Sequence, residues 1–557
     1  MVPHGRARAL AAPPTRMIKS SRRAPAIETP QMPPVRTWLL LLAIGSWPLA
    51  SKASDAVLQV RTESGIVEGA VTGRGASRVR TFLGIPYAAP PLGDLRWRPP
   101  QPVAQWTGAR RATKFGARCM QKPVFGDMAF RDSGHNEDCL FLNVWTPASV
   151  NKKLPVMVWI YGGGFVTGST SEGRQDGSVL AAEGVVVVSM NYRVGIFGFL
   201  VLPELAAESG HNAAGNYGLL DQLAALHWVR ANIAAFGGDP DNVTIFGESA
   251  GSFSVSALMA SSEAHGLFQK AIGESGAAFF SSAIAFDSLP AREQRDATLI
   301  RASLGEQTLA ELRAMPAQKL LNAFFKPGSA LNFVFVPDID GYFLRGSLPA
   351  IFAAGQQNDV PLLAGWNHDE GSFNLAAAPK RTTVDSMKAT AQKEFGAHAA
   401  DFLRLYSADT DAEAERSLED FLGDRFIAWS TWRWMEAQAS TGKQPIYRYR
   451  FDLAPPGDPN GPRLGAYHSS EIEYVFGQLD SKADVGSRPQ DRKLSKQMQE
   501  YWTNFARSGD PNGPDLPKWP VYSSGTGWQV MYLDERPEAH PDDRRSRYLF
   551  LATMWEK

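Results

Sequence analysis

The chain has 557 residues, and its 57 basic side chains balance its 57 acidic ones. This neutrality speaks against a nucleic-acid binder, and the length is too great for one small domain. Hydrophobic residues make up 44% of the chain and charged residues 20%, which are the values of a packed globular protein. The composition therefore excludes disorder, coiled coil and collagen as the main state of the chain.

An apolar run at residues 38–49 is the one segment that suggests a membrane-directed chain. At about a dozen residues it is too short to cross a bilayer, which takes about 20. Arg36 precedes the run and small residues follow it up to Ala53, so it has the parts of a signal peptide cleaved after Ala53. We expect a secreted or periplasmic protein without a stable membrane span. A buried helix is the alternative, and the start at Met1 or at Met32 is left open.

The sequence contains two cysteines, Cys119 and Cys139. In an oxidising compartment two cysteines this close are expected to form a disulfide, whose loop would stabilise the fold by roughly 3 kcal/mol. A zinc site is not supported, because the chain has no Cys-x-x-Cys and His135 is the only histidine near the pair. We therefore expect a disulfide and no metal.

The pattern of apolar residues changes along the chain. Residues 56–116 alternate short β-like runs with Gly/Pro turns, which predicts an antiparallel start to a sheet. Short, continuously apolar strands follow at 156–160, 185–188 and 243–246, and residues 216–235 show helical periodicity. Such strands alternating with helices indicate an α/β fold with a mostly parallel sheet covered on both faces.

The second half of the chain continues this pattern. Further strands are predicted at 360–364 and 446–451. Residues 281–350 and 380–440 look helical, and we expect them to cover the edge of the sheet at which the strands end.

The strand at 243–246 runs into Gly247-Glu248-Ser249-Ala250-Gly251 and then into a helix of small residues. Gly-x-Ser-x-Gly between a strand and a helix is the signature of a nucleophile elbow. Side chains at 247 and 251 would clash with nearby backbone, and Ser249 would be held strained with its hydroxyl exposed. The helix N-terminus favours developing negative charge. A glycine-lined turn with a capping serine is the alternative, and the flanking strand and helix favour catalysis.

A second glycine motif, Tyr161-Gly162-Gly163-Gly164-Phe165, follows the strand at 156–160. Consecutive glycines leave backbone N–H groups free to point at one spot, which in acyl transfer is the oxyanion. The N–H of Ala250, beside the serine, is the natural further donor. A phosphate-binding loop does not fit, because no Gly-Lys-Ser/Thr follows, and a flexible turn is the remaining alternative.

A serine nucleophile needs a base, which is usually a histidine oriented by a carboxylate. In α/β-hydrolases the chain order is serine, acid, histidine, so the histidines before Ser249 are excluded. His265 comes too soon after the serine, His398 lies in a helical pattern, and His540 lies in a charged C-terminal loop. His468 follows the last of the predicted strands after a loop, and it is the best candidate for the base.

The acid is expected directly after the strand at 360–364. Asp369 and Glu370 both lie there, and either could orient an imidazole. The residues alone do not separate the two. Their neighbour His368 is not expected to take part.

Longer motifs extend the evidence beyond single residues. Phe236-Gly237-Gly238-Asp239-Pro240 precedes the elbow, and Glu137-Asp138-Cys139-Leu140-Phe141-Leu142-Asn143-Val144 lies earlier. With these motifs the chain resembles the type-B carboxylesterases, which include cholinesterases and bacterial para-nitrobenzyl esterases, over about residues 56–550. Further matches are Asn191-Tyr192-Arg193, Gly215-Asn216-Tyr217-Gly218 and Tyr501-Trp502-Thr503-Asn504-Phe505-Ala506.

The resemblance implies an α/β-hydrolase fold, with a large mostly parallel sheet and helical insertions over the active site. We expect residues 1–53 to be an N-terminal extension with the signal peptide, and residues 54–557 to be a single domain. The resemblance makes Ser249 the nucleophile and His468 the base, and it resolves the acid as Glu370. It assigns the oxyanion hole to the backbone N–H groups of Gly163, Gly164 and Ala250.

The resemblance also implies roles around the triad. Glu248 and Ser275 are expected to support it without contacting substrate, and Phe165 and Phe373 are the expected substrate-binding residues. The resemblance pairs Cys119 with Cys139, in agreement with the expectation from the compartment. The loop between the cysteines, residues 120–138, departs from the cholinesterases because it lacks the tryptophan that they use against a quaternary ammonium. Cholinesterase activity is therefore not expected.

The expected activity is carboxylic ester hydrolysis through an acyl-enzyme, without metal or organic cofactor. The partner is a small ester, not nucleic acid. A lipase acting at an interface is the main alternative, and a non-catalytic binding protein of the same fold is a second. The sequence leaves the natural ester and the oligomeric state open.

Overall fold

The computed structural model describes residues 58–149, 153–279, 284–377, 381–457, 464–481, 486 and 488–556. Contacts divide the chain into two units, Met1–Ala56 and Val57–Lys557, and the fold described below is that of the second. The predicted signal peptide and its cleavage point at Ala53 lie outside the described residues. Within the described ranges no helix has both the length and the apolar character that a membrane span requires.

The sheet begins with antiparallel strands, as the turn-rich start of the sequence predicts. Strand β2 (Gly65–Thr72) pairs antiparallel with β1 (Leu58–Thr62) and with β3 (Val79–Pro86). Strand β7 (Phe141–Pro147) then joins β3 to the central strands, antiparallel on both sides. Strand β4 (Ala109–Arg111) pairs with β2 outside this path.

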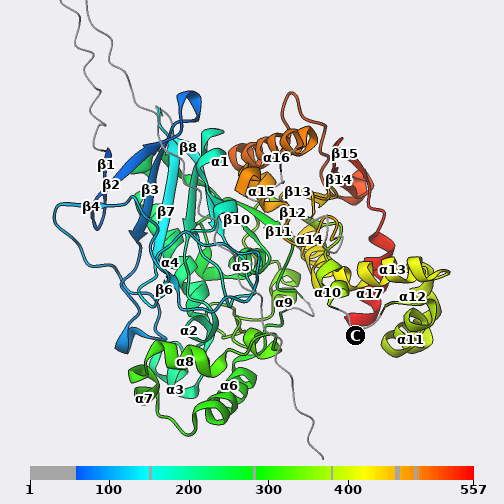
Figure 1. Ribbon diagram of the computed structural model, residues 1–557, viewed down its shortest axis with the longest axis horizontal. Helices are drawn as coiled ribbons and strands as arrows, with labels where there is room; N and C mark the ends of the chain where they lie inside the picture. Colours follow the sequence, from blue (N-terminus) through cyan, green and yellow to red (C-terminus); the bar gives the residue numbers. More distant parts are fainter. Residues whose placement is uncertain are drawn as a thin grey trace, which may run out of the picture. The chain divides into compact units, whose positions relative to one another are not determined.

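The centre of this 13-stranded sheet is parallel (Figure 1). Its strands are buried along nearly their whole length, which explains why they read as continuous apolar runs. One antiparallel strand closes the far edge. In spatial order these strands are β9 (Val186–Met190), β8 (Leu154–Ile160), β10 (Gly238–Glu248), β11 (Lys270–Glu274), β12 (Leu362–Asn367), β13 (Ile446–Phe451), β14 (Gln529–Leu533) and β15 (Glu538–Pro541).

Helices cover both faces of the parallel sheet, as predicted. Successive residues of a strand point to opposite faces, and Phe246 and Gly247 of β10 show what lies on each. The ring of Phe246 packs against Phe476 of α15 (Ile472–Phe476), with ring centroids 5.7 Å apart. On the other face, a Cβ at Gly247 would lie 2.7 Å from the backbone of Gly251 in α5 (Ala250–Ala260). The large fold is thus a sheet between two helical layers.

Two details differ from the sequence-based expectations. Strand β12 runs from Leu362 through Gly365 to Asn367, three residues beyond the predicted end at 364, because Gly365 leaves room for the ring of Tyr449 on the neighbouring strand. His540 lies in strand β15, paired opposite Val530, and the expected loop there is wrong. The polar residues that suggest a loop suit an edge strand, whose outer side is not covered by another strand.

The two predicted helical regions are helical, and they are inserted between strands. The chain between 396 and 428 also contains a 3-10 turn, η7 (Gly396–His398), and a π-helical segment, η8 (Asp424–Ala428), which joins α13 directly to α14. The helices of the two regions are α6 (Leu289–Leu304), α7 (Leu309–Ala314), α8 (Ala317–Phe324), α9 (Leu348–Ala353), α11 (Val384–Phe395), α12 (Ala399–Leu405), α13 (Asp411–Gly423) and α14 (Trp429–Thr441).

Candidate active site

Ser249 lies in the sharp turn between β10 and α5, as the motif predicts. Its backbone has φ 53° and ψ −123°, a conformation that non-glycine residues seldom adopt and that the surrounding structure must hold in place. Its N–H donates to the carbonyl oxygen of Glu274, 2.9 Å away. A Cβ at position 251 would overlap the carbonyl oxygen of Ile160. The turn is therefore possible only because Gly251 has no side chain.

Replacing Gly251 with alanine is expected to lower the free energy of unfolding by about 1–3 kcal/mol, because β8 and α5 must move apart. Denaturant unfolding of the purified variant measures this loss. Gly126→Ala is the matched control, since nothing lies within 4 Å of a Cβ at that position. Equal stability of the two variants would contradict the close approach of α5 to β8.

His468 lies between Ser249 and Glu370. Its Nε2 is 3.0 Å from the hydroxyl oxygen of Ser249, and its Nδ1 is 2.6 Å from Oε2 of Glu370. With the proton on Nδ1, the ring donates to Glu370 and Nε2 is free to accept from the serine hydroxyl. The three side chains follow the C-terminal ends of β10, β12 and β13, the edge at which open parallel sheets bind their ligands.

The carboxylate of Glu370 is held from behind. Its side chain is only 2% exposed, and Oε1 accepts the hydroxyl of Ser275 at 2.6 Å and the backbone N–H of Asn367 at 2.9 Å. A buried carboxylate needs such donors, which here also fix the direction of Oε2 toward His468. Asp369, which the residues alone did not separate from Glu370, points away from the imidazole to Arg416.

The glycine motif after β8 lies against the elbow. A Cβ at Gly162 would be 2.9 Å from the Cβ of Ser249, so this loop passes directly beside the serine. Gly163 and Gly164 have φ of 106° and 64°, and among the described residues no oxygen accepts the N–H of either. Ala250 is the first residue of α5, where helical N–H groups have no partner within the helix. These N–H groups remain available to a ligand.

Carboxylates surround His468 and change its protonation. Burial opposes the charged ring, but the carboxylates of Glu370 and Glu248 outweigh this effect and raise the pKa of His468 to about 9. Oε1 of Glu248 lies 3.3 Å from Nε2. Burial in turn raises the pKa of Glu248 to about 8. Glu248 therefore titrates close to the range in which the imidazole does.

Replacing Glu248 with glutamine is expected to lower the pKa of His468 by about one unit. In the wild type, Glu248 ionises as the pH rises and then holds the proton on the imidazole, whereas glutamine carries no charge at any pH. The acid limb of the kcat/KM profile should move to lower pH. Rates of para-nitrophenyl acetate hydrolysis between pH 5 and 10, with the wild type in the same buffers, measure this shift. An unmoved or raised limb would contradict the effect of the carboxylate.

Aromatic rings lie on several sides of the site. Phe426, from the π-helical segment η8, packs its ring against that of His468, with centroids 5.1 Å apart. A Cβ at Gly164 would lie 2.7 Å from the ring of Phe333, so the first helical region also reaches the site. The helical insertions thus pack over Ser249, His468 and Glu370, as predicted.

The two predicted substrate-binding rings differ in exposure. Phe165 is fully buried and packs edge-on against Phe199, whereas Phe373 is 47% exposed and contacts Tyr467. Their contact with substrate remains a prediction.

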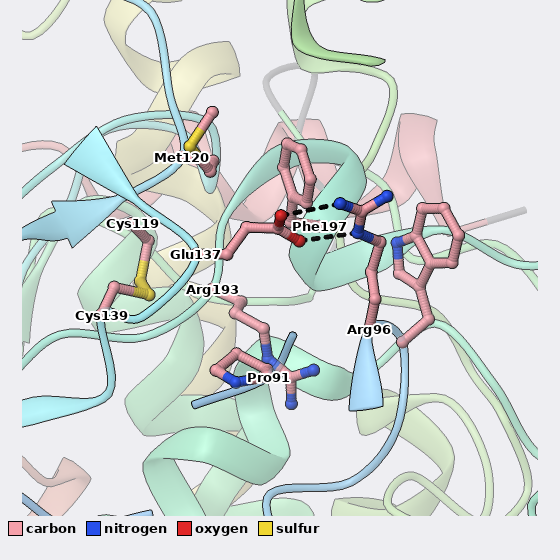
Figure 2. A pocket seen from close by; sticks show the side chains of 9 residues that line it. Pro91, Arg96, Cys119, Met120, Glu137, Cys139, Arg193 and Phe197 are labelled. Atoms are coloured by element: carbon pink, nitrogen blue, oxygen red, sulfur yellow. Dashed lines mark hydrogen bonds and ion pairs between the residues drawn. A yellow bond between two sulfur atoms is a disulfide. The ribbon is translucent and has the colours of Figure 1, made fainter. Parts of the chain in front are cut away.

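The predicted disulfide between Cys119 and Cys139 is present, with Cα atoms 4.9 Å apart (Figure 2). Close to it, Arg96 forms a two-point ion pair with Glu137, at 2.6 and 2.7 Å. Figure 2 shows this pair and the disulfide lining the same small pocket. The disulfide therefore joins the two ends of the loop at 120–138, and the ion pair fastens its second end to Arg96.

Three residues near the predicted triad members were not predicted. Asn367 supports Glu370 with its N–H, and its side chain donates to Oε2 of Glu471 at 2.5 Å. Both residues lie within three positions of a predicted triad member, so their nearness in sequence was an available signal. Phe426 precedes His468 by more than forty positions, and no local pattern connects them.

The sheet order, the two helical layers and the elbow define an α/β-hydrolase fold. The family model for the carboxylesterase family matches residues 56–550, and the chain belongs to this family. As a member it is a serine ester hydrolase that acts on small esters.

The similarity to several known proteins extends over most of the chain. The fumonisin B1 esterase of Sphingopyxis macrogoltabida is 38% identical over 87% of this chain and 88% of its own. The para-nitrobenzyl esterase of Bacillus subtilis is 36% identical over 86% of this chain and 97% of its own. The acetylcholinesterase of Bungarus fasciatus is 34% identical over 95% of this chain and 91% of its own.

Proposed function

We propose that Ser249, His468 and Glu370 form the catalytic triad of this ester hydrolase. The observation that carries the proposal is the unbroken line of contacts from the serine hydroxyl to Nε2 at 3.0 Å and from Nδ1 to the Glu370 carboxylate at 2.6 Å. This line joins a nucleophile, a base and a buried acid, the three groups that serine catalysis requires.

In this mechanism Ser249 attacks the ester carbonyl while Nε2 of His468 takes its proton. The negative charge then develops on the carbonyl oxygen, and the N–H groups of Gly163, Gly164 and Ala250 donate to it. The imidazolium returns the proton to the departing alcohol, and water hydrolyses the acyl-enzyme by the same route. Glu370 stabilises the imidazolium, with Ser275 and Asn367 holding its carboxylate. Glu248, once ionised at high pH, stabilises the imidazolium by its charge.

Labelling with an organophosphate tests the proposed nucleophile. The reagent should inactivate the protein with one phosphoryl group per chain, and mass spectrometry of the digested protein should place that group on the peptide containing Ser249. Ser249→Ala should take up no label at the same concentration. A label on another serine would refute the assignment. So would a Ser249→Ala variant that takes up as much label as the wild type.

The proposed substrates are soluble carboxylic esters without a quaternary ammonium group. The loop at 120–138 has Phe125 and Phe130 as its aromatic residues, and Phe130 lies under the guanidinium of Arg118, which occupies its face. A cation therefore finds no tryptophan there. A series of para-nitrophenyl esters of increasing acyl length would give the size of the acyl pocket. Rates that saturate smoothly support an esterase, and a jump above micelle formation would favour a lipase.

We also propose that the chain is exported, and that removal of residues 1–53 leaves a single catalytic domain at 54–557. The disulfide supports this proposal, because such bonds persist in oxidising compartments. N-terminal sequencing of the protein recovered from the medium or the periplasm should begin at Ser54. An intact N-terminus on cytoplasmic protein would contradict it.

A further inference from the structure

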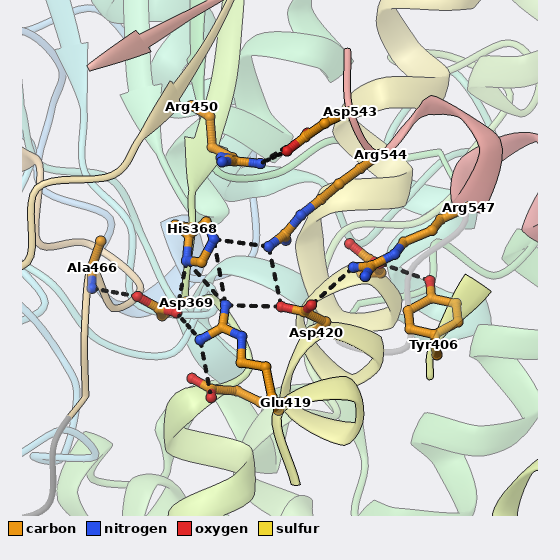
Figure 3. Close-up of polar contacts among 12 residues, drawn as sticks. His368, Asp369, Tyr406, Glu419, Asp420, Arg450, Ala466, Asp543, Arg544 and Arg547 are labelled. Atoms are coloured by element: carbon orange, nitrogen blue, oxygen red, sulfur yellow. Dashed lines mark hydrogen bonds and ion pairs between the residues drawn. The ribbon is translucent and has the colours of Figure 1, made fainter. Parts of the chain in front are cut away.

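Two hydrogen bonds of Asp369 fasten the loop that carries His468 to the loop that carries Glu370. The backbone N–H of Asp369 donates to the carbonyl oxygen of Ala466 at 3.0 Å. Its carboxylate Oδ2 accepts the N–H of Ala466 at 2.7 Å, as Figure 3 shows. Asp369 is the neighbour of Glu370, and Ala466 lies two residues before His468. The two hydrogen bonds therefore fix the base loop against the acid loop directly beside the triad.

The shape of the base loop is adapted to this carboxylate. Gly465 has φ 66°, and a Cβ at this position would overlap Oδ2 of Asp369. A second tie runs in parallel, since the side chain of Asn367 donates to the carbonyl oxygen of Tyr467 at 2.7 Å. The hydrogen bonds of Asp369 and Asn367 together leave the loop that carries His468 little freedom to shift relative to β12.

Asp369 is itself held in place by a cluster of charged side chains (Figure 3). Arg416 of α13 donates to Oδ1 of Asp369 at 2.7 Å and to Oδ1 of Asp420 at 2.9 Å. His368 lies with its Nδ1 2.9 Å from Oδ1 of Asp369, while Arg544 donates to the other ring nitrogen at 3.0 Å. Oδ2 is thereby left to Ala466, because the arginine and the histidine take Oδ1.

The charge of Asp369 is well stabilised. Burial acts against ionisation, but the hydrogen bonds of His368 and Arg416, with the charge of Arg416, hold the pKa of Asp369 below its usual value. An ionised acceptor binds a backbone N–H more strongly than a neutral one. The tie to Ala466 is therefore a charge-assisted bond at neutral pH.

We infer that Asp369, held by Arg416, is a positioning residue that sets the distance between Glu370 and His468. The inference rests on the proposed function, because it presupposes the roles of these two residues. Asp369 touches neither substrate nor the reacting atoms. Its loss should misplace the imidazole and slow turnover, and the binding of the ester should change little, because the hydrogen bonds of Asp369 go to Ala466, Arg416 and His368.

The experiment compares turnover per active site, because active-site titration separates misplaced from unfolded protein. The fraction of chains that react with an organophosphate is measured for each variant, and kcat is divided by it. Asp369→Ala and Arg416→Met should lower kcat per titrated site by about tenfold to hundredfold, with KM within about twofold of the wild type. Arg416→Lys, which keeps a cation beside Asp369, should restore most of the rate.

Asp424→Asn is the matched control. Asp424 is a buried carboxylate of the adjoining η8 and accepts the hydroxyl of Tyr406 at 2.7 Å. Among the described residues, no hydrogen bond joins its side chain to Asp369, Glu370, Ala466 or His468. This variant should melt at a lower temperature with kcat per titrated site unchanged. If kcat per titrated site fell as far in Asp424→Asn as in Asp369→Ala, the inference would be overturned. The loss would then follow from removing any buried carboxylate in this region.

Two further outcomes are decisive. Wild-type kcat per titrated site in Asp369→Ala would overturn the inference and leave the triad intact, whereas full activity of Ser249→Ala would refute the proposed function instead. If Asp369→Ala does not fold, the comparison of Arg416→Lys with Arg416→Met decides. Equal rates per site in this pair would overturn the inference, and a slower methionine variant would support it.

Discussion

Replacing Ser249 with alanine is expected to lower kcat by about 10⁴- to 10⁶-fold, leaving the slow rate that oriented donors alone sustain. The hydroxyl of Ser249 is the one that His468 contacts, at 3.0 Å, so removing it removes the proposed nucleophile and leaves the imidazole in place. The substrate should still bind, since the change deletes a single atom. Hydrolysis of para-nitrophenyl acetate by wild type and variant at equal concentrations of folded protein measures the loss.

Ser256→Ala is the control for this substitution. Ser256 lies in the same helix, and its hydroxyl donates to the carbonyl oxygen of Phe253 at 2.8 Å, away from the triad. This variant should keep the wild-type kcat and lose only some stability. If Ser249→Ala retained more than a few per cent of the activity, another nucleophile would have to act, and the proposed triad would fail.

Replacing Glu370 with glutamine should lower kcat by about 10⁴-fold. The amide keeps the size of the side chain, and it loses the charge that stabilises the imidazolium. An amide nitrogen turned toward Nδ1 would also favour the ring form with its proton on Nε2, which cannot accept from Ser249. Ser275 and the N–H of Asn367 occupy Oε1, and both require an oxygen there, which turns the amide nitrogen toward the ring.

Glu274→Gln is the matched control for Glu370→Gln. Glu274 is equally buried, and Trp502 donates to its Oε1 at 2.8 Å. Burial raises the pKa of Glu274 well above its usual value, so burial disfavours the charged form, which glutamine also lacks. Its variant should retain the wild-type kcat. Equal losses in the two variants would show that any buried carboxylate here matters, and the role of Glu370 would not be specific.

Local motifs made much of the site predictable. The elbow around Ser249 is recognisable from sequence because a strand, a turn and a helix follow one another directly. Its glycines are needed where these adjoining segments pack too closely for a side chain. The N–H groups of Gly163 and Gly164 are free for the same reason, since consecutive glycines determine the shape of their own loop. The sheet was predictable because parallel strands buried on both faces are continuously apolar.

The acid shows where sequence reasoning needed help. Asp369 and Glu370 are neighbours of like chemistry, and the resemblance to a family was required to choose between them. The structure shows the physical cause of their difference. Arg416, 47 residues further along, draws Asp369 to one side, while Ser275 receives Glu370 on the other. No local pattern carries that information, because both partners come from other elements.

The positions of Ser249 and His468 bear on the order of events in folding. The two residues are 219 positions apart, and they meet only when β10, β12 and β13 have paired. Contacts this distant in sequence form slowly, and chains of this size pass through collapsed intermediates first. On refolding, recovery of ester hydrolysis should therefore lag behind recovery of helical circular dichroism. In this protein, recovery of enzyme activity therefore reports that the sheet is complete. The chain becomes compact before that point.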